Sequence, residues 1–358
     1  MEDETLVASG LGCLDGATAG RLMQTLLNRR VLTPLTARAF SGAPVTKLVL
    51  DSNPWATNKL LAELGRKVSL TDLSLAHCDA VTERGIQGLS GLRGLLRLDV
   101  SGCKVTDAWL EALAPLPSLK TLEMRRAAKV GDKGLFHLSH APSLQKLDLL
   151  GCTGLTEAGV VGLGPALLRR LTWLRVDGAV WGVTDASLAS ICPHMPALQA
   201  FSLEGCSGVT DEALRPMAAS LTSLTSLNLR GTSATQTGLS HLATAPACRA
   251  RLRRLLLPSR GRGVTGEGLA RLARLPALTE LDLEGLSVAP GPGALRPLAR
   301  LTALRELSLA GAPAADDAAV AAFCHPGACA RLRSLNLNGT PPLPPRIPGQ
   351  SPSLVRLW

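Results

Sequence analysis

The sequence predicts an α/β solenoid of about twelve repeats, in which a parallel sheet is backed by a layer of helices. Three observations carry this prediction. A leucine pattern recurs along the 358 residues, a Val-Thr-Asp or Val-Thr-Glu turn follows many of its copies, and helically spaced leucines come after the turn. Composition agrees with it, because five tryptophans, four phenylalanines and no tyrosine leave a core made mostly of leucine.

The strand part of the repeat becomes visible when the chain is compared with itself. Leu70-Thr-Asp-Leu-Ser-Leu-Ala-His-Cys78 recurs as 95–103, 144–152 and 198–206. Alternation around the second and third apolar positions indicates a short strand with one buried face. The mean step between copies is about 26 residues, inside the range of leucine-rich repeats. The weaker copies begin at Val45, Leu119, Leu171, Leu224, Leu252, Leu278, Leu304 and Leu332.

A helix is expected after each strand. The turn threonines, such as Thr184, can cap a helix N-terminus, and the acid after them complements the positive end of the helix dipole. Three residues after the threonine the side chain is usually small, as at Gly85 and Gly159, which should allow close packing between helix and sheet. Trp109 stands at this position in one repeat. We expect it to be exposed on the helical side or to mark a local distortion.

Stacked repeats bury a core that a single repeat cannot bury alone. Parallel strands stack about 4.8 Å apart, whereas packed helices need roughly 8–10 Å. Because the two layers differ in spacing, the array must curve. We therefore expect residues 45–340 to form a horseshoe with the parallel sheet on its concave face and the helices on its convex face.

The two ends lie outside the repeats. Residues 1–44 are predicted to form an N-terminal helical cap, because solenoids need their terminal cores shielded, with a degenerate F-box as the alternative. Residues 341–358 are proline-rich. Pro341, Pro344 and Arg346 fit a PxxPxR ligand of an SH3 domain. We favour a C-terminal cap for this tail, because its last apolar residues need burial.

The pattern LxxLxLxxCxxVTDxGLxxL, as in residues 144–163, resembles the cysteine-containing subfamily of leucine-rich repeats. That subfamily occurs in F-box/LRR proteins, in AMN1-like antagonists of mitotic exit and in related ciliary proteins. The resemblance implies protein recognition, often as the substrate arm of an SCF-type ubiquitin ligase that binds a Skp1-type adaptor. The alternative that it implies is a scaffold subunit beside other subunits of a large assembly such as the ciliary axoneme, similar to the nexin–dynein regulatory complex.

Binding residues are expected on the concave face, where side chains between the strand leucines point. Trp173 is the only aromatic residue predicted on this surface, and tryptophan and arginine are common interface anchors. The alternative is a solvated face of mixed charge without a ligand. The predicted patch consists of Trp173, Arg175, Arg125, Glu123 and Asp148.

A basic strip lies within residues 249–274 and supplies much of the formal charge of +10. Such a strip could attract acidic protein tails or nucleic acid. No aromatic residue is interleaved with it, so we favour a solvated face or a protein contact over nucleic acid. The strip contains Arg251, Arg253, Arg254, Arg260 and Arg262.

The sequence predicts no enzyme, no cofactor and no metal site. It has no GxxxxGK[ST], HExxH or GxSxG motif. Cys78, Cys103, Cys152 and Cys206 recur once per repeat, which suits buried thiols that donate weakly to loop carbonyls better than paired zinc ligands. The acidic N-terminus and the lack of a long apolar run predict no secretory signal and no membrane span. An odd cysteine count favours a reducing, cytoplasmic location, with the ciliary axoneme or nucleus as alternatives.

Overall fold

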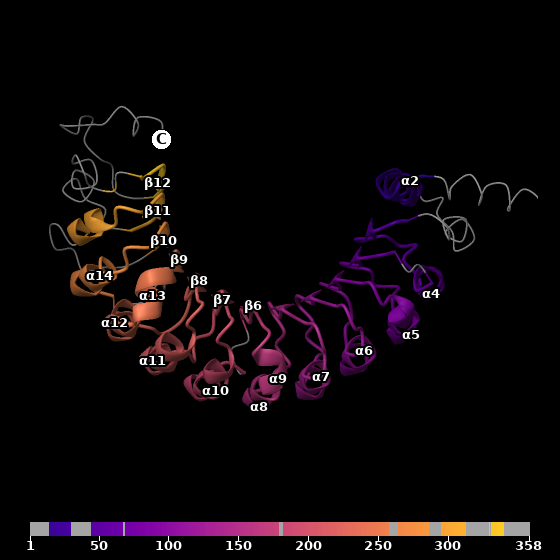
Figure 1. Cartoon of the computed structure of the whole chain (residues 1–358), viewed down its shortest axis with the longest axis horizontal. Coiled ribbons are helices and arrows are strands. Elements are labelled where there is room, and N and C mark those ends of the chain that lie inside the picture. Colours follow the sequence, from indigo (N-terminus) through magenta and orange to yellow (C-terminus); the bar gives the residue numbers. More distant parts are fainter. Residues whose placement is uncertain are drawn as a thin grey trace, which may run out of the picture. The chain divides into compact units, whose positions relative to one another are not determined.

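The computed structural model describes residues 14–29, 44–66, 69–178, 182–257, 264–285, 295–312, 329 and 331–339. Twelve short parallel strands form one sheet and follow one another in chain order from β1 to β12 (Figure 1). Each strand begins two residues after the predicted start of its repeat. The predicted α/β solenoid is thus confirmed. By its internal contacts the chain divides into two units, Met1–Leu174 and Arg175–Trp358, so the division falls within β6.

The first unit contains the N-terminal helix and the first five complete repeats. Its central strand residues, such as Leu73 and Leu98, pair in register and are buried. Its elements are α2 (Gly16–Asn28), β1 (Lys47–Val49), α4 (Asn58–Leu64), β2 (Asp72–Ser74), α5 (Glu83–Gln87), η1 (Gly88–Gly91), β3 (Arg97–Asp99), α6 (Asp107–Leu113), β4 (Thr121–Glu123), α7 (Asp132–Leu138), β5 (Lys146–Asp148), α8 (Glu157–Val161), α9 (Gly164–Leu168) and the start of β6 (Trp173–Arg175).

The second unit continues the same strand–helix alternation. Its central strand residues, such as Leu227 and Leu255, are also buried and in register. Beyond β6 it contains α10 (Asp185–Ile191), η2 (Cys192–His194), β7 (Ala200–Ser202), α11 (Asp211–Ser220), β8 (Ser226–Asn228), α12 (Gln236–Thr244), α13 (Pro246–Arg251), β9 (Arg254–Leu256), α14 (Gly266–Leu272), β10 (Glu280–Asp282), η3 (Arg296–Arg300), β11 (Glu306–Ser308) and β12 (Ser334–Asn336).

The aspartate that begins the helix after the turn joins consecutive repeats. Asp132, the first residue of α7, accepts hydrogen bonds from the backbone N–H of Thr156 at 2.9 Å and from its hydroxyl at 2.5 Å. Asp185 accepts the corresponding bonds from Thr210 at 2.8 and 2.6 Å. We call this contact the Asp–Thr latch. It gives the acid a direct partner in the next repeat, in addition to the favourable helix N-terminus that the sequence predicts.

The small residue after the turn makes room for this latch. A Cβ atom at Gly134 would lie 2.6 Å from Oδ1 of Asp107, and a Cβ atom at Gly85 would lie 2.5 Å from Oδ1 of Asn58. Real Cβ atoms do not approach neighbours this closely. The predicted close packing therefore exists, but it is packing against the preceding repeat's helix N-terminus and not against the sheet.

Trp109 occupies the same position in α6 and is buried, with 2% of its surface exposed. The expectation that it would be exposed is therefore wrong. The preceding repeat begins its helix with the longer Glu83, whose carboxylate accepts a hydrogen bond from Gln87 at 3.0 Å within the same helix. No aspartate at the start of the preceding helix therefore reaches towards Trp109. We infer that the indole ring of Trp109 occupies the space that such a carboxylate would fill.

The cysteines of the repeat have the structural role predicted for them. Cys78 and Cys103 donate through Sγ to the backbone carbonyls of Leu50 and Leu75, both at 3.0 Å. All seven described cysteines are buried and none forms a disulfide. Burial is the main cause that raises the pKa of Cys78 to about 12 and of Cys152 to about 11.

These thiols should make the fold sensitive to alkaline pH. An unfolded cysteine has a pKa near 8.5, below the folded values, so the buried thiols stabilise the fold fully below about pH 8.5 and progressively less towards pH 11–12. We expect the urea midpoint measured by circular dichroism to fall from about pH 8.5 upwards. The chain has no tyrosine to titrate in the same window. Cys78→Ala should reduce this pH slope, and an unchanged midpoint between pH 7 and 10 would contradict the expectation.

The helix α2 covers the free edge of β1. Its Gln24 side chain donates to the carbonyl of Val49 at 2.7 Å and accepts from the Val49 N–H at 3.1 Å, as a neighbouring strand would. Ala19 and Met23 on the same helix are buried. The edge strand therefore has its polar backbone groups at Val49 paired by a side chain.

Candidate protein-binding face of the sheet

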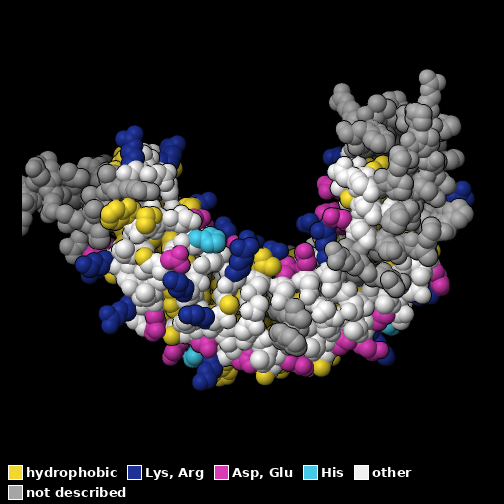
Figure 2. Space-filling view, turned by 180° about the vertical axis from the view of Figure 1, so that it is seen from behind, with side chains coloured by type: hydrophobic (Ala, Val, Ile, Leu, Met, Phe, Trp, Pro, Cys, Tyr) yellow, Lys and Arg dark blue, Asp and Glu magenta, His cyan; other side chains and the backbone are white. Residues whose placement is uncertain are grey.

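The open face of the sheet is built from the first and third residues of each strand, because successive side chains point to opposite faces. In β3 and β4 these residues are Arg97, Asp99, Thr121 and Glu123, while the central leucines are buried beneath them. On the side of the molecule drawn in Figure 2, basic and acidic side chains are interspersed and do not form large fields of one sign.

Four charged side chains form a continuous chain of ion pairs across β3, β4 and β5. Arg97 contacts Glu123 through Nη2 at 2.6 Å, and Arg125 contacts the other oxygen of Glu123 at 3.1 Å. Arg125 also donates through Nε to Asp148 at 2.6 Å. We call these residues the ion-pair chain. It brings together three members of the predicted patch, Glu123, Arg125 and Asp148, and adds Arg97.

The two acids of this chain are more buried than its two arginines, and the Glu123 side chain is 13% exposed. The Asp148 side chain is fully buried, whereas those of Arg125 and Arg97 are 42% and 48% exposed. The hydrogen bond to Asp148 is the main cause that raises the pKa of Arg125, with the charges of Asp148 and Glu123 adding to it and partial burial opposing it. Arg125 is therefore a fixed positive charge held over a buried carboxylate.

Some acids on this face also serve the fold. Asp148 accepts a hydrogen bond from the N–H of Leu150 at 3.1 Å, and Asp99 accepts one from Ser101 at 2.9 Å. The same bond recurs at Asn228 in the second unit. An Asp or Asn that ends a strand thus pairs a backbone N–H two residues later. This local role, which sequence reasoning missed, was visible as Asp or Asn repeated at one strand position.

The other two patch residues lie on β6. Trp173 is half-buried, and its backbone N–H donates to Gln145, so it lies beside β5 in the first unit. Arg175 belongs to the second unit, where it forms an ion pair with the buried Asp177. Asp177 also accepts a hydrogen bond from the N–H of Glu204 at 2.9 Å. The structure thus engages Arg175 in a local pair that the sequence did not reveal.

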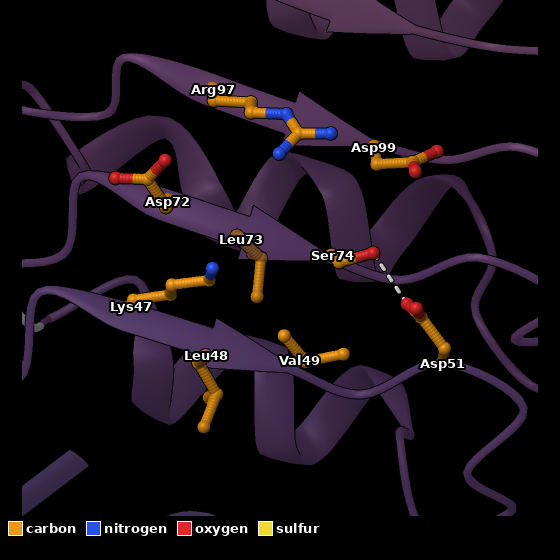
Figure 3. Close-up of a pocket in the computed structure, with 9 residues that line it drawn as sticks. All are labelled: Lys47, Leu48, Val49, Asp51, Asp72, Leu73, Ser74, Arg97 and Asp99. Carbon is orange, nitrogen blue, oxygen red and sulfur yellow. Dashed lines mark hydrogen bonds between the residues drawn. The ribbon is translucent and has the colours of Figure 1, made fainter. Parts of the chain in front are cut away.

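A hollow of about 180 Å³ lies on the open face next to the ion-pair chain, between β1, β2 and β3. Figure 3 shows its charged side chains rising from three neighbouring strands. Arg97 lines this hollow and also pairs with Glu123, so the two features are continuous. The other polar residues that line it are Lys47, Asp51, Asp72, Ser74 and Asp99.

The basic strip is only partly described. Arg251 and Arg253 are exposed, while Arg254 pairs with Glu280 at 2.9 Å. Arg260 and Arg262 lie outside the described residues, as does the proline-rich tail. The described part of the chain contains no cluster of three metal-ligating side chains. It also contains no helix that is long and apolar enough to span a membrane.

Comparison with solved structures identifies the fold. The internalin inlF from Listeria monocytogenes aligns with 90% of this chain and 81% of its own, with a TM-score of 0.55 and 21% identity. The fold is that of a leucine-rich-repeat protein. A chain of the yeast Rad7–Elc1 complex aligns with 87% of this chain and 88% of its own, at a TM-score of 0.41 and 18% identity.

Sequence comparison is more limited. No family model matches the chain. The Caenorhabditis elegans protein EEED8.10, whose name gives RNA binding as a provisional property, is 30% identical over 112 residues. That match covers 30% of this leucine-rich-repeat chain and only 15% of the length of the nematode protein.

Proposed function

We propose that this chain is a non-catalytic protein-recognition module, and that the open sheet face of its first unit binds the partner. The ion-pair chain is the observation that carries the proposal. Arg97, Glu123 and Arg125 hold one another in place before any partner arrives, which lowers the ordering cost of binding. Their alternating charges would favour a partner of matching pattern and reject others.

The size of the hollow favours a protein partner over a metabolite. Its volume of about 180 Å³ is smaller than the roughly 300–1,000 Å³ of ordinary small-molecule sites. One partner side chain is the better occupant. Asp51, Asp72 and Asp99 outnumber the bases Lys47 and Arg97, and Arg97 is already paired with Glu123. We therefore expect the partner to place a lysine or arginine side chain in the hollow.

Trp173→Ala tests this face. Tryptophan anchors commonly contribute 2 kcal/mol or more to binding, so we expect affinity for the partner to fall by at least about tenfold while the urea midpoint stays unchanged. The partner would first be identified by affinity purification and mass spectrometry with the full chain. Trp55→Ala is the matched control, because Trp55 is 49% exposed in the same unit but lies outside the face. Equal binding by wild type and Trp173→Ala would exclude the proposed face.

A role as the recognition arm of an SCF-type ligase, with a Skp1-type adaptor as partner, is the finer function that the resemblance suggests. It would require residues 1–44 to offer a free adaptor surface. We infer that α2 acts instead as the N-terminal cap, because Met23 is buried and Gln24 is engaged by Val49. The same purification tests this inference, and specific recovery of a Skp1-type adaptor would refute it.

The name of the nematode relative mentions RNA binding, but for this chain RNA binding has less support than protein binding. Trp173 is the only aromatic residue among the described positions of the open sheet face, and base stacking on single strands uses several aromatic platforms. The acids of the ion-pair chain would also repel phosphate. The sheet face therefore favours protein recognition.

A further inference from the structure

Arginines stand in a row beside the sheet of the second unit. Backbone hydrogen bonds connect one residue of each repeat to the corresponding residue of the next. Each N–H donates to the carbonyl of its counterpart in the preceding repeat at 2.7 or 2.8 Å, and the connected residues are Thr225, Arg253, Thr279, Arg305 and Arg333. These residues therefore lie side by side at the points where the chain enters β8, β9, β10, β11 and β12. Arg253, Arg305 and Arg333 are all exposed, and we call them the arginine row.

The fold does not need arginine at these positions. In other repeats the same position often holds threonine, as at Thr225 and Thr279. Their hydroxyls donate to a backbone carbonyl of the preceding repeat, at 2.9 and 3.1 Å. No arginine of the row forms an ion pair with a described residue. Arg305 and Arg333 are direct neighbours, and like charges at that separation destabilise a sheet. The row therefore has a structural cost with no internal compensation among the described contacts.

Further arginines reinforce the row. They occupy the segments that lead into the same strands, including α13, which lies between α12 and β9 (Figure 1). All are exposed and none forms an ion pair with a described residue. The result is a basic rim along β9–β12 that extends well beyond the strip predicted from residues 249–274. The flanking residues are Arg251, Arg274, Arg300 and Arg331.

The sheet next to this rim carries acidic side chains at β10 and β11, of which Glu280 is paired with Arg254 of β9. Glu280 and Glu306 are register neighbours in β10 and β11, and each directly follows the rim residue Thr279 or Arg305 in sequence. Asp282 and Glu284 lie further along the same repeat and both pair with Arg230. A ligand that crosses from the rim onto the sheet thus meets positive and then negative charge.

We propose that this rim binds an acidic segment of a partner protein. Guanidinium groups bind carboxylates through two parallel hydrogen bonds. From Arg253 to Arg333 the row spans three strand steps, about 14 Å, which an extended peptide covers in about five residues with alternate side chains on one side. The segment would therefore carry Asp or Glu at two or three alternate positions. A peptide can place neutral or basic groups over Glu280 and Glu306, whereas a nucleic acid would bring phosphate to them.

Fluorescence anisotropy with the full chain tests this proposal. The probe is a labelled peptide of about twelve residues with alternating Glu and Ser, long enough to cover the row. At about 100 mM salt, where weak long-range attraction is screened, we expect saturable binding. The triple variant Arg253→Gln, Arg305→Gln, Arg333→Gln should weaken it by at least about tenfold, because three exposed charge contacts are lost.

Arg84→Gln, Arg93→Gln, Arg169→Gln is the matched control. These arginines are exposed in the first unit and their removal changes the net charge equally, so we expect peptide affinity within about twofold of wild type. Absent peptide binding, or equal losses in the two triple variants, would overturn the proposal. So would a single-stranded RNA of equal charge that binds as tightly as the peptide. Trp173→Ala should leave peptide binding unchanged, so this result and the test of the first unit's face are independent.

Discussion

Gly238→Ala is expected to destabilise the chain by about 2–3 kcal/mol, although glycine-to-alanine changes inside helices usually stabilise by about 0.5–1 kcal/mol. A Cβ atom at Gly238 would lie 2.5 Å from Oδ1 of Asp211 and 2.5 Å from Cδ1 of Leu214. The carboxylate cannot simply move away, because Oδ1 accepts from the N–H groups of Thr235 at 2.7 Å and Gly238 at 2.9 Å. Urea unfolding followed by circular dichroism measures the change.

Gly20→Ala in α2 is the matched control, because a Cβ atom there would lie 3.6 Å from the carbonyl oxygen of Lys47, an ordinary contact. We expect it to leave stability unchanged or raise it slightly. Asp211→Ala removes the clashing oxygen, so the double variant with Gly238→Ala should be more stable than the sum of the single effects by 1 kcal/mol or more. Strict additivity would show that the Asp–Thr latch does not set the space at Gly238.

The repeat could be predicted from sequence because strand leucines and turn residues report on local geometry. The latch could not, because Asp132 and Thr156 are 24 residues apart and their contact depends on how neighbouring repeats stack. The pattern was nevertheless present. Asp or Asn begins the helix of the preceding repeat before Gly85, Gly134, Gly159 and Gly238, whereas Gln236 precedes Gly268 and the longer Glu83 precedes Trp109. Trp109 is buried because the preceding repeat leaves a space for its ring. The secondary-structure propensities of neighbouring residues carry no information about that space.

The arrangement of the candidate patch was predicted less completely. Strand alternation correctly placed Glu123, Arg125 and Asp148 on one face, because side-chain direction follows from strand geometry. Strand alternation could not show that these three side chains form ion pairs with one another. Ion pairing depends on side-chain rotamers and burial, which the pattern does not specify. Arg175 illustrates the limit, because its guanidinium is committed to Asp177 within its own repeat.

Arg125→Met is expected to destabilise the first unit by about 2–3 kcal/mol. It would leave the carboxylate of Asp148, which is fully buried, without its positive partner, and breaking a buried pair by removing one member typically costs about 3–5 kcal/mol. We expect a loss at or below the lower end of this range, because Arg125 is 42% exposed and water can replace its side chain beside Asp148. The remaining hydrogen bond from Leu150 at 3.1 Å also moderates the loss.

Arg97→Met separates this effect from a general loss of surface charge. Arg97 is 48% exposed and pairs with Glu123, which is not fully buried, so its removal should cost less than about 1 kcal/mol. Asp148→Asn in the Arg125→Met background should recover part of the stability, because the uncompensated charge is gone. Equal urea midpoints for Arg125→Met and Arg97→Met would mean that Asp148 does not depend on Arg125. If the expected difference is found, Arg125 cannot serve as a binding probe, since its loss disturbs the face itself, and Trp173→Ala remains the variant that reports on recognition alone.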